Sequence, residues 1–211
     1  MEQEVLKTGT TTIGIVCSDG IVLAADRRAT AGNFIVNKNI QKVHELVENM
    51  VLTMAGSVSD VQLLIKVIRA EINLKKIRTG REISMKEASN MLASLVYSNI
   101  RRYSLIPGVS HFILGGKDKE GFHLYDIYAD GSVTEVTDYV SSGSGSVMAY
   151  GVLETLFVPN MSITEAAKLV IKGLNAAIQR DSASGNGYDI FAITKDGVKK
   201  IAGKDVTVKV E

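Results

Sequence analysis

The sequence predicts an α+β fold with four layers, in which two sheets lie between two pairs of helices. Three observations support this prediction: runs of segments with apolar residues at every second position, two helix pairs with a period of about 3.6 residues, and turns containing Gly or Asp between the strands. Strands in runs and helices in runs indicate segregated layers rather than alternating β-α units. Two sheets, each covered on one face by a helix pair, give an αββα sandwich.

The predicted elements follow the order sheet, helix pair, sheet, helix pair, strands. Strands are predicted over 11–17, 21–26, 40–46, 50–54, 111–114, 122–127, 133–136, 188–194 and 198–201. Asp19-Gly20 and Asp196-Gly197 are typical of hairpin turns. Residues 29–33 are predicted to form a loop, and we expect the segments up to residue 54 to form one sheet.

Helical periodicity begins after Gly56 and runs from Ser59 to Thr79-Gly80. Two capping boxes, Ser84-Met85-Lys86-Glu87 and Ser162-Ile163-Thr164-Glu165, each predict the start of an amphipathic helix. A further helix is predicted over 147–156. It follows the run 141–146, whose small polar residues we do not expect inside a strand and whose backbone amides are free to donate to another group.

Composition and charge restrict the classes of function. The 211 residues fit one domain, and 45% hydrophobic with 22% charged residues is typical of a folded globular chain. A net charge of +1 provides no global field for nucleic acid or an acidic membrane. Cys17 is the single cysteine, which excludes an internal disulfide. Because no signal-like or membrane-spanning stretch is found either, we expect a cytoplasmic protein.

Motifs for several other chemistries are missing. The histidines, His44, His111 and His123, stand apart from other ligand-type residues, so we expect structural roles and no metal. The chain has no G-x-S-x-G elbow, and Gly115-Gly116-Lys117 lacks the first glycine and the final Ser or Thr of a phosphate loop. The basic residues between 75 and 81 indicate a solvated helix end rather than a nucleic-acid patch. We therefore expect no cofactor.

The run Gly9-Thr10-Thr11-Thr12 has one interpretation with catalytic consequences. Cleavage between Gly9 and Thr10 gives Thr10 a free α-amine beside its hydroxyl, and an amine with a pKa of ~7.7 to 8.0 can accept the hydroxyl proton near neutral pH. Glycine before the cut lets the backbone bend, so that the hydroxyl reaches the preceding carbonyl. The alternative is a strand that begins with three threonines, which these residues alone favour.

Six segments, in this order along the chain, carry a family resemblance: Gly9-Thr10-Thr11-Thr12-Ile13-Gly14, Asp26-Arg27-Arg28, Lys42, Met54-Ala55-Gly56, Gly143-Ser144-Gly145-Ser146 and Arg180-Asp181-Ser182-Ala183-Ser184-Gly185. Together they resemble the catalytic β subunits of the 20S proteasome, especially the archaeal type. The resemblance runs from Gly9 almost to the C-terminus. It implies the N-terminal nucleophile hydrolase fold, a four-layer αββα sandwich, and threonine endopeptidase activity.

The resemblance implies a role for each residue near Thr10. Thr10 is the nucleophile, and its freed amine accepts the proton through a water. Lys42 lowers the pKa of the hydroxyl and of the amine, and Asp26 holds the lysine. Without the resemblance, a surface ion pair between Asp26 and Lys42 remains the alternative.

The resemblance further implies that the backbone amide of Gly56 forms an oxyanion hole. It assigns Ser144, Asp181 and Ser184 to a polar cluster that binds and orients the Thr10 amine. The residues alone leave a second interpretation for all four positions, because a helix start, caps and turns use the same residue types.

By the same resemblance, an extended substrate lies between Thr30 and residues 56–58 and adds a strand. The pocket for the side chain before the scissile bond is lined by Ala29, Ile40, His44, Met54 and Val58. Small Ala29 at the entrance and apolar Met54 at the floor predict a preference for large hydrophobic residues, with no carboxylate to attract a basic one.

The resemblance also implies a propeptide and partners. Residues 1–9 are expected to be a removable propeptide and 10–211 a single catalytic domain, so the chain as written is the inactive precursor. The implied partners are β subunits in seven-membered rings with two rings stacked, α-subunit rings, an unfoldase ATPase on the assembled particle and polypeptide substrates, without nucleic acid or membrane. Two alternatives are a noncatalytic ring subunit, against which the combined polar residues argue, and a small-amide hydrolase of the same fold.

Overall fold

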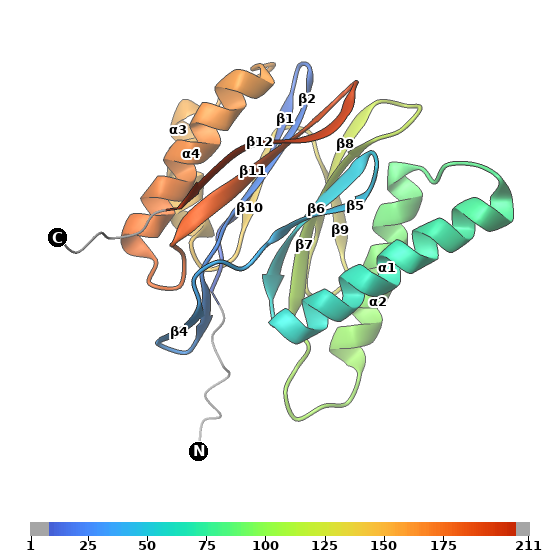
Figure 1. Ribbon diagram of the computed structural model, residues 1–211, viewed down its shortest axis with the longest axis horizontal. Helices are drawn as coiled ribbons and strands as arrows, with labels where there is room; N and C mark the ends of the chain where they lie inside the picture. Colours follow the sequence, from blue (N-terminus) through green and yellow to red (C-terminus); the bar gives the residue numbers. More distant parts are fainter. Residues whose placement is uncertain (1–8, 206–211) are drawn as a thin grey trace.

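The computed structural model describes residues 9–205. In Figure 1 the described chain forms four layers: a helical layer of α3 (Ser146–Leu156) and α4 (Ile163–Arg180), two sheets, and a helical layer of α1 (Val58–Thr79) and α2 (Met85–Arg101). This arrangement confirms the predicted αββα sandwich.

The helices α3 and α4 cover one face of the first sheet. Its strand order is β10-β1-β2-β11-β12, and every neighbouring pair is antiparallel. Its strands are β1 (Thr12–Cys17), β2 (Gly20–Asp26), β10 (Tyr139–Ser142), β11 (Gly187–Thr194) and β12 (Gly197–Asp205). The chain therefore begins inside this sheet, returns to its edge as β10 before α3, and completes the sheet with β11 and β12 after α4.

The second sheet covers α1 and α2 and has the order β5-β6-β7-β8-β9, again antiparallel throughout. Its strands are β5 (Val43–Val47), β6 (Met50–Gly56), β7 (Ser110–Lys117), β8 (Phe122–Ile127) and β9 (Val133–Val136). Each strand pairs with the next strand along the chain, and α1 and α2 are inserted between β6 and β7.

Three groups of buried apolar side chains hold the layers together. One lies between the sheets and includes Leu23, Val51 and Ile113. Each of the other two fills the space between one sheet and its helix pair. Alternate residues of each strand thus face a helical layer and the opposite sheet, which explains the nearly continuous burial of β1, β2 and β6.

The prediction that the segments up to residue 54 form one sheet is wrong. The first hairpin, β1-β2, belongs to one sheet and the second, β5-β6, to the other, while residues 29–33 lie not in a plain loop but in a separate hairpin of β3 (Ala29–Ala31) and β4 (Phe34–Asn37). Period-two alternation identifies strands but does not say which strands pair across a long connection. The segment from 27 to 42 therefore crosses between the sheets.

The ends of the helices follow the predicted chemistry. Gly80, with φ 65°, ends α1 in a left-handed conformation, and Ser84 and Ser162 form complete capping boxes with Glu87 and Glu165. The expectation that residues 141–146 avoid strands is wrong for Ser141 and Ser142, which end β10. Both side chains form hydrogen bonds there, Ser141 Oγ with the Thr12 carbonyl and Ser142 Oγ with Thr12 Oγ1.

No helix in the described part of the chain is long and apolar enough to cross a membrane.

Candidate active site

The predicted site residues come together at one end of the sandwich, where both sheets end. Thr10 lies just before β1, Asp26 is the last residue of β2, and Lys42 directly precedes β5. Gly56 ends β6 in the second sheet. Because the connection after β2 crosses to the second sheet, its two ends bring Asp26 and Lys42 together between the layers.

Asp26 is fully buried and accepts hydrogen bonds at both carboxylate oxygens. Oδ1 accepts from Lys42 Nζ at 2.7 Å and from the Thr11 backbone N–H at 3.0 Å. Oδ2 accepts from the N–H groups of Arg28 and Gly185, each at 2.9 Å. Four donors from separate segments fix the orientation of this carboxylate, and they compensate for its removal from water.

Lys42 is buried, with 3% of its surface exposed. Its ammonium contacts Asp26 and also donates to the Gly9 carbonyl at 3.4 Å. Burial lowers the pKa of Lys42 below its ordinary value, and the charge of Arg28 adds to this effect, while Asp26 and Asp181 oppose it. The Lys42 ammonium therefore holds its proton less tightly than the ammonium of a surface lysine.

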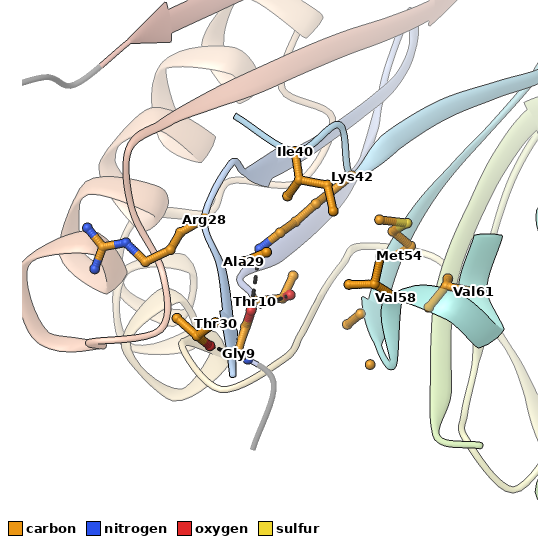
Figure 2. A pocket seen from close by; sticks show the side chains of 12 residues that line it. Gly9, Thr10, Arg28, Ala29, Thr30, Ile40, Lys42, Met54, Val58 and Val61 are labelled. Carbon is orange, nitrogen blue, oxygen red and sulfur yellow. Dashed lines mark hydrogen bonds between the residues drawn. The ribbon is translucent and has the colours of Figure 1, made fainter. Parts of the chain in front are cut away.

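Thr10 and Gly9 meet this ammonium. Thr10 Oγ1 donates to the Gly9 carbonyl oxygen at 2.6 Å, so two donors, a hydroxyl and an ammonium, converge on one carbonyl (Figure 2). The Gly9 N–H donates to Thr30 Oγ1 at 3.3 Å, which holds the other side of the residue. The peptide bond between Gly9 and Thr10 is thus fixed beside the hydroxyl that follows it.

Gly9 has no room for a side chain. A Cβ built on it lies 1.8 Å from the Cβ of Ala183 and 2.8 Å from Ser144 Oγ. Because Gly9 has no side chain, its backbone can pass between Ala183 and Ser144. This steric requirement for glycine is different from the backbone flexibility that the sequence suggested as its role.

A chain of hydroxyls connects Thr10 to Asp181, the residue that caps the end of α4. The Thr10 N–H donates to Ser144 Oγ at 3.2 Å, and Ser144 Oγ donates to Asp181 Oδ2 at 2.6 Å. Ser184 Oγ donates to the same oxygen at 2.6 Å and lies 2.7 Å from Thr11 Oγ1. The structure thus brings Ser144, Asp181 and Ser184 together, and of these three Ser144 is the one that contacts the Thr10 nitrogen.

Gly56 faces the pocket from the second sheet. Its φ of 118° is one that side-chain-bearing residues rarely adopt, and a Cβ built there lies 2.2 Å from the carbonyl oxygen of Val109. The pocket that Gly56 borders is lined by Gly9, Thr10, Arg28, Ala29, Thr30, Ile40, Lys42, Met54, Ala55, Gly56, Val58 and Val61. Its wall is apolar at Ile40, Met54 and Val58, and Lys42 and Thr10 form its polar end (Figure 2).

His44 is not among the residues that line this pocket. Its Nε2 lies 3.0 Å from the carbonyl oxygen of Gln41, and burial, together with the charge of Arg69 on α1, lowers its pKa. The other residues predicted for the pocket, Ala29, Ile40, Met54 and Val58, all line it. Thr30, which was predicted to flank the extended substrate, lines it as well.

Sequence reasoning missed several contributors. Thr11 donates its N–H to Asp26 and places its hydroxyl beside Ser184, while Gly145 donates to the Thr10 carbonyl at 3.3 Å. The expectation that backbone amides in the run 141–146 are free to donate was the one sequence signal that pointed to the Gly145 contact. Val61 and Ala55 also line the pocket, and nothing in their residue type distinguishes them from core residues.

This arrangement suits acyl transfer. The Thr10 hydroxyl and the Lys42 ammonium, both on buried residues, donate to the same Gly9 carbonyl oxygen. A hydroxyl–carboxylate chain from Ser144 to Asp181 reaches the Thr10 backbone nitrogen. An apolar pocket adjoins these groups, and the backbone of Gly56 lines that pocket from the second sheet.

Comparison with known proteins agrees with this geometry. Residues 6–193 match the family described as proteasome subunit. The chain is 44% identical to a proteasome subunit beta of Methanocorpusculum labreanum, with 96% of each chain covered. It is 39% identical to that of Archaeoglobus fulgidus (98% of this chain, 95% of the relative) and 42% identical to that of Methanohalophilus mahii (94% and 92%). The chain belongs to the proteasome subunit family.

Proposed function

We propose that this protein is a catalytic proteasome β subunit, a threonine endopeptidase made as a precursor and activated by its own cleavage between Gly9 and Thr10. The single observation that carries the proposal is the convergence of Thr10 Oγ1 and Lys42 Nζ on the Gly9 carbonyl oxygen, at 2.6 Å and 3.4 Å. Packing alone does not require a buried ammonium and a threonine hydroxyl at one peptide bond.

Activation is an intramolecular acyl transfer. Thr10 Oγ1 adds to the Gly9 carbonyl carbon, the C–N bond to Thr10 breaks, and the hydroxyl proton ends on the departing nitrogen. Water then hydrolyses the resulting ester, which releases residues 1–9 and regenerates the Thr10 hydroxyl beside the amine that the first step freed. Residues 1–8 lie outside the described residues, so the contacts that support this step come from Gly9, which Thr30 and Lys42 hold on two sides.

The mature site applies the same chemistry to a bound polypeptide. The freed amine accepts the hydroxyl proton, and it stays beside Ser144, whose hydroxyl the Asp181 carboxylate orients. Lys42, held by Asp26, provides positive charge next to the nucleophile and lowers the pKa of its hydroxyl. The Gly56 amide stabilises the oxyanion, a contribution of about 2.7 to 4 kcal/mol for a donor of this kind.

Substrate preference follows from the pocket wall. Ile40, Met54 and Val58 present apolar surface, and no carboxylate is among the residues that line the pocket. A large hydrophobic side chain before the scissile bond buries this surface, whereas a basic side chain loses its hydration without a partner. We propose cleavage after large hydrophobic residues.

Assembly belongs to the same proposal. Large apolar side chains are exposed on the described chain, including Tyr103 (95%), Leu105 (82%), Ile77 (80%) and Val147 (76%). Apolar surface of this extent suits burial against other subunits. We propose homoheptameric β rings, two of them stacked, capped by α-subunit rings and fed by an unfoldase ATPase in the cytoplasm.

The test uses the full chain assembled with its α subunits. Intact mass is expected to show loss of residues 1–9 in the wild type and in Thr10→Ser, and retention in Thr10→Ala. Fluorogenic peptides with Leu or Phe before the reporter should be cleaved faster than those with Arg or Asp.

Thr10→Ala provides the control without a nucleophile, since it removes the hydroxyl and the methyl group of one buried side chain. Equal turnover by Thr10→Ala and the wild type, or a full-length mass in an active particle, would refute the proposal. An assembled, uncleaved and inactive wild type would indicate a noncatalytic ring subunit instead.

A further inference from the structure

Arg28 binds a loop that the catalytic proposal does not explain. Its side chain leaves the pocket and points away from Thr10 and Lys42 (Figure 2). Its Nε donates to Asn186 Oδ1 at 2.8 Å, and its Nη1 donates to the Ser182 carbonyl at 2.7 Å. The planar guanidinium thus connects two points of the segment 182–186 that follows α4, a geometry that a single ammonium cannot reproduce.

Gly185 passes directly beneath this guanidinium. A Cβ built on Gly185 lies 2.3 Å from Arg28 Nη2 and 2.5 Å from Cζ. Any side chain there displaces the arginine, so the loop backbone and the guanidinium are fitted to each other.

The loop held in this way carries groups of the site. Ser184 donates to Asp181, and the Gly185 N–H donates to Asp26 Oδ2 at 2.9 Å. Asp26 in turn holds Lys42 through its other oxygen. One turn between α4 and β11 thus contacts both Asp181, which binds Ser144 beside the Thr10 nitrogen, and Asp26, which holds the ammonium.

We propose that Arg28 is a positioning residue, whose guanidinium fixes the loop 182–186 so that Ser184 and Gly185 keep Asp181 and Asp26 in catalytic orientation. Arg28 itself touches no reacting atom in this scheme. The inference rests on the proposed threonine endopeptidase function. It states that Arg28, which takes no part in the reaction, holds in place the groups that do.

The positive charge of Arg28 has a second, separable effect. It adds to the lowering of the Lys42 pKa, which burial dominates and which Asp26 and Asp181 oppose. Arg28→Lys keeps a positive charge but cannot bind both Asn186 and the Ser182 carbonyl. A purely electrostatic role is therefore rescued by lysine, whereas a positioning role is not.

The experiment compares Arg28→Met and Arg28→Lys in the full chain assembled with α subunits. Self-cleavage is followed by intact mass against time, and kcat and KM are measured with a hydrophobic fluorogenic peptide. For Arg28→Met we expect kcat and the self-cleavage rate to fall about tenfold or more, with KM within about twofold, because the orientation of catalytic groups is lost while the pocket wall remains. In Arg28→Lys, the decrease in log kcat relative to the wild type should be more than half of the decrease seen in Arg28→Met.

Arg27→Met is the matched control. Arg27 is the adjacent residue and is also largely buried, but its guanidinium binds Asp189 on β11 through Nε at 3.0 Å and Nη2 at 2.7 Å. Its backbone N–H donates to the Gly185 carbonyl at 3.2 Å, and the substitution keeps that group. We expect it to lower the melting temperature and to leave kcat and self-cleavage near those of the wild type.

Asn186→Gly keeps the inference testable if the arginine variants assemble poorly, because glycine adopts the left-handed backbone of this position (φ 61°) without strain. It removes the partner of Nε and leaves Arg28 in place, so it should lower kcat in the same direction, and its effect should not add to that of Arg28→Met. Wild-type kcat in assembled Arg28→Met, full rescue by lysine, or additive effects of the two changes would each overturn the inference. An inactive, uncleaved wild type would instead contradict the proposed function.

Discussion

Two groups of charged residues in this protein have similar chemistry and opposite surroundings. Between the sheets, Lys42 binds Asp26 at 2.7 Å with side chains 4% and 0% exposed. Between α1 and α2, Glu87 binds Arg81 at 2.7 Å and Lys75 at 2.9 Å, with side chains 29% to 52% exposed. The second group strengthens a helix cap, whereas the first lies beside Thr10.

The difference in burial shows what each group can contribute. Exposed pairs add little to stability, because water already solvates both partners. In a buried ion pair, the attraction between the charges offsets the large desolvation cost only when the geometry and the other hydrogen bonds are ideal. A protein with apolar residues in place of the pair is often as stable. The buried pair therefore gives the fold little advantage, while an ammonium at the nucleophile suits catalysis. The predictions below test this contrast, from the largest effect to the smallest.

Lys42→Met should abolish most of the activity. Removing the ammonium from beside Thr10 is expected to reduce peptide turnover and self-cleavage by roughly 10² to 10⁴, the range for loss of a proton-handling group. Rates come from the fluorogenic peptide assay and from intact mass against time.

Its control separates stability from catalysis. Lys42→Met leaves the Asp26 charge buried without its partner and should destabilise the subunit by about 3 to 5 kcal/mol. Adding Asp26→Asn removes that charge and should restore part of the stability while activity stays lost; the recovery is partial because the single amide oxygen cannot accept all three backbone N–H groups that the carboxylate binds. Recovery of activity in the double variant would contradict the role given to the ammonium.

The pH profile should show the altered lysine. Burial lowers the pKa of Lys42, so its charged form is complete below that lowered pKa and is lost as pH rises through it. Activity should therefore fall on the alkaline side before the pH reaches ~10.4, the ordinary lysine value. Asp26 and Asp181 limit this shift and Arg28 extends it. Circular dichroism at each pH checks that the fold persists, and a flat rate up to the onset of unfolding would count against Lys42.

Thr30→Val should slow self-cleavage more than peptide turnover. The Thr30 hydroxyl accepts the Gly9 N–H at 3.3 Å, and valine keeps the shape of the side chain without the acceptor. Loss of one such bond predicts a decrease of about fivefold in the rate at which residues 1–9 are released. Thr30→Ser, which retains the hydroxyl, is the control. Equal rates for the valine and serine variants would show that this bond does not orient the cleaved peptide.

The local structure was predictable because local chemistry specifies it. The capping boxes at Ser84 and Ser162 and the glycine that ends α1 fixed the helix ends. Sheet membership was not predictable from alternation, because the β1-β2 and β5-β6 hairpins have the same pattern and belong to different sheets.

The site was predictable only in part, and only through the family resemblance. Spacing along the chain does not indicate that Asp26 and Lys42 meet, since the crossing between sheets brings them together. Arg28 and Thr11 were missed because their contacts depend on backbone approach, which residue type does not reveal. His44 was assigned to the pocket by position, but its ring lies against the Gln41 carbonyl.

Glu87→Gln tests the exposed side of the comparison and should have the smallest effect. Glutamine preserves the capping box with Ser84, so the variant removes only the charge that pairs with Arg81 and Lys75. Arg81 above all lowers the pKa of Glu87, so the ionised form contributes stability above the ordinary Glu pKa of ~4.3 and loses it as pH falls through the lowered value. Thermal unfolding at neutral pH should show a loss below about 1 kcal/mol, reduced by salt, with kcat unchanged. A loss as large as that of Lys42→Met would mean that exposure does not separate the two groups, and the argument that the buried pair is kept for catalysis would lose its basis.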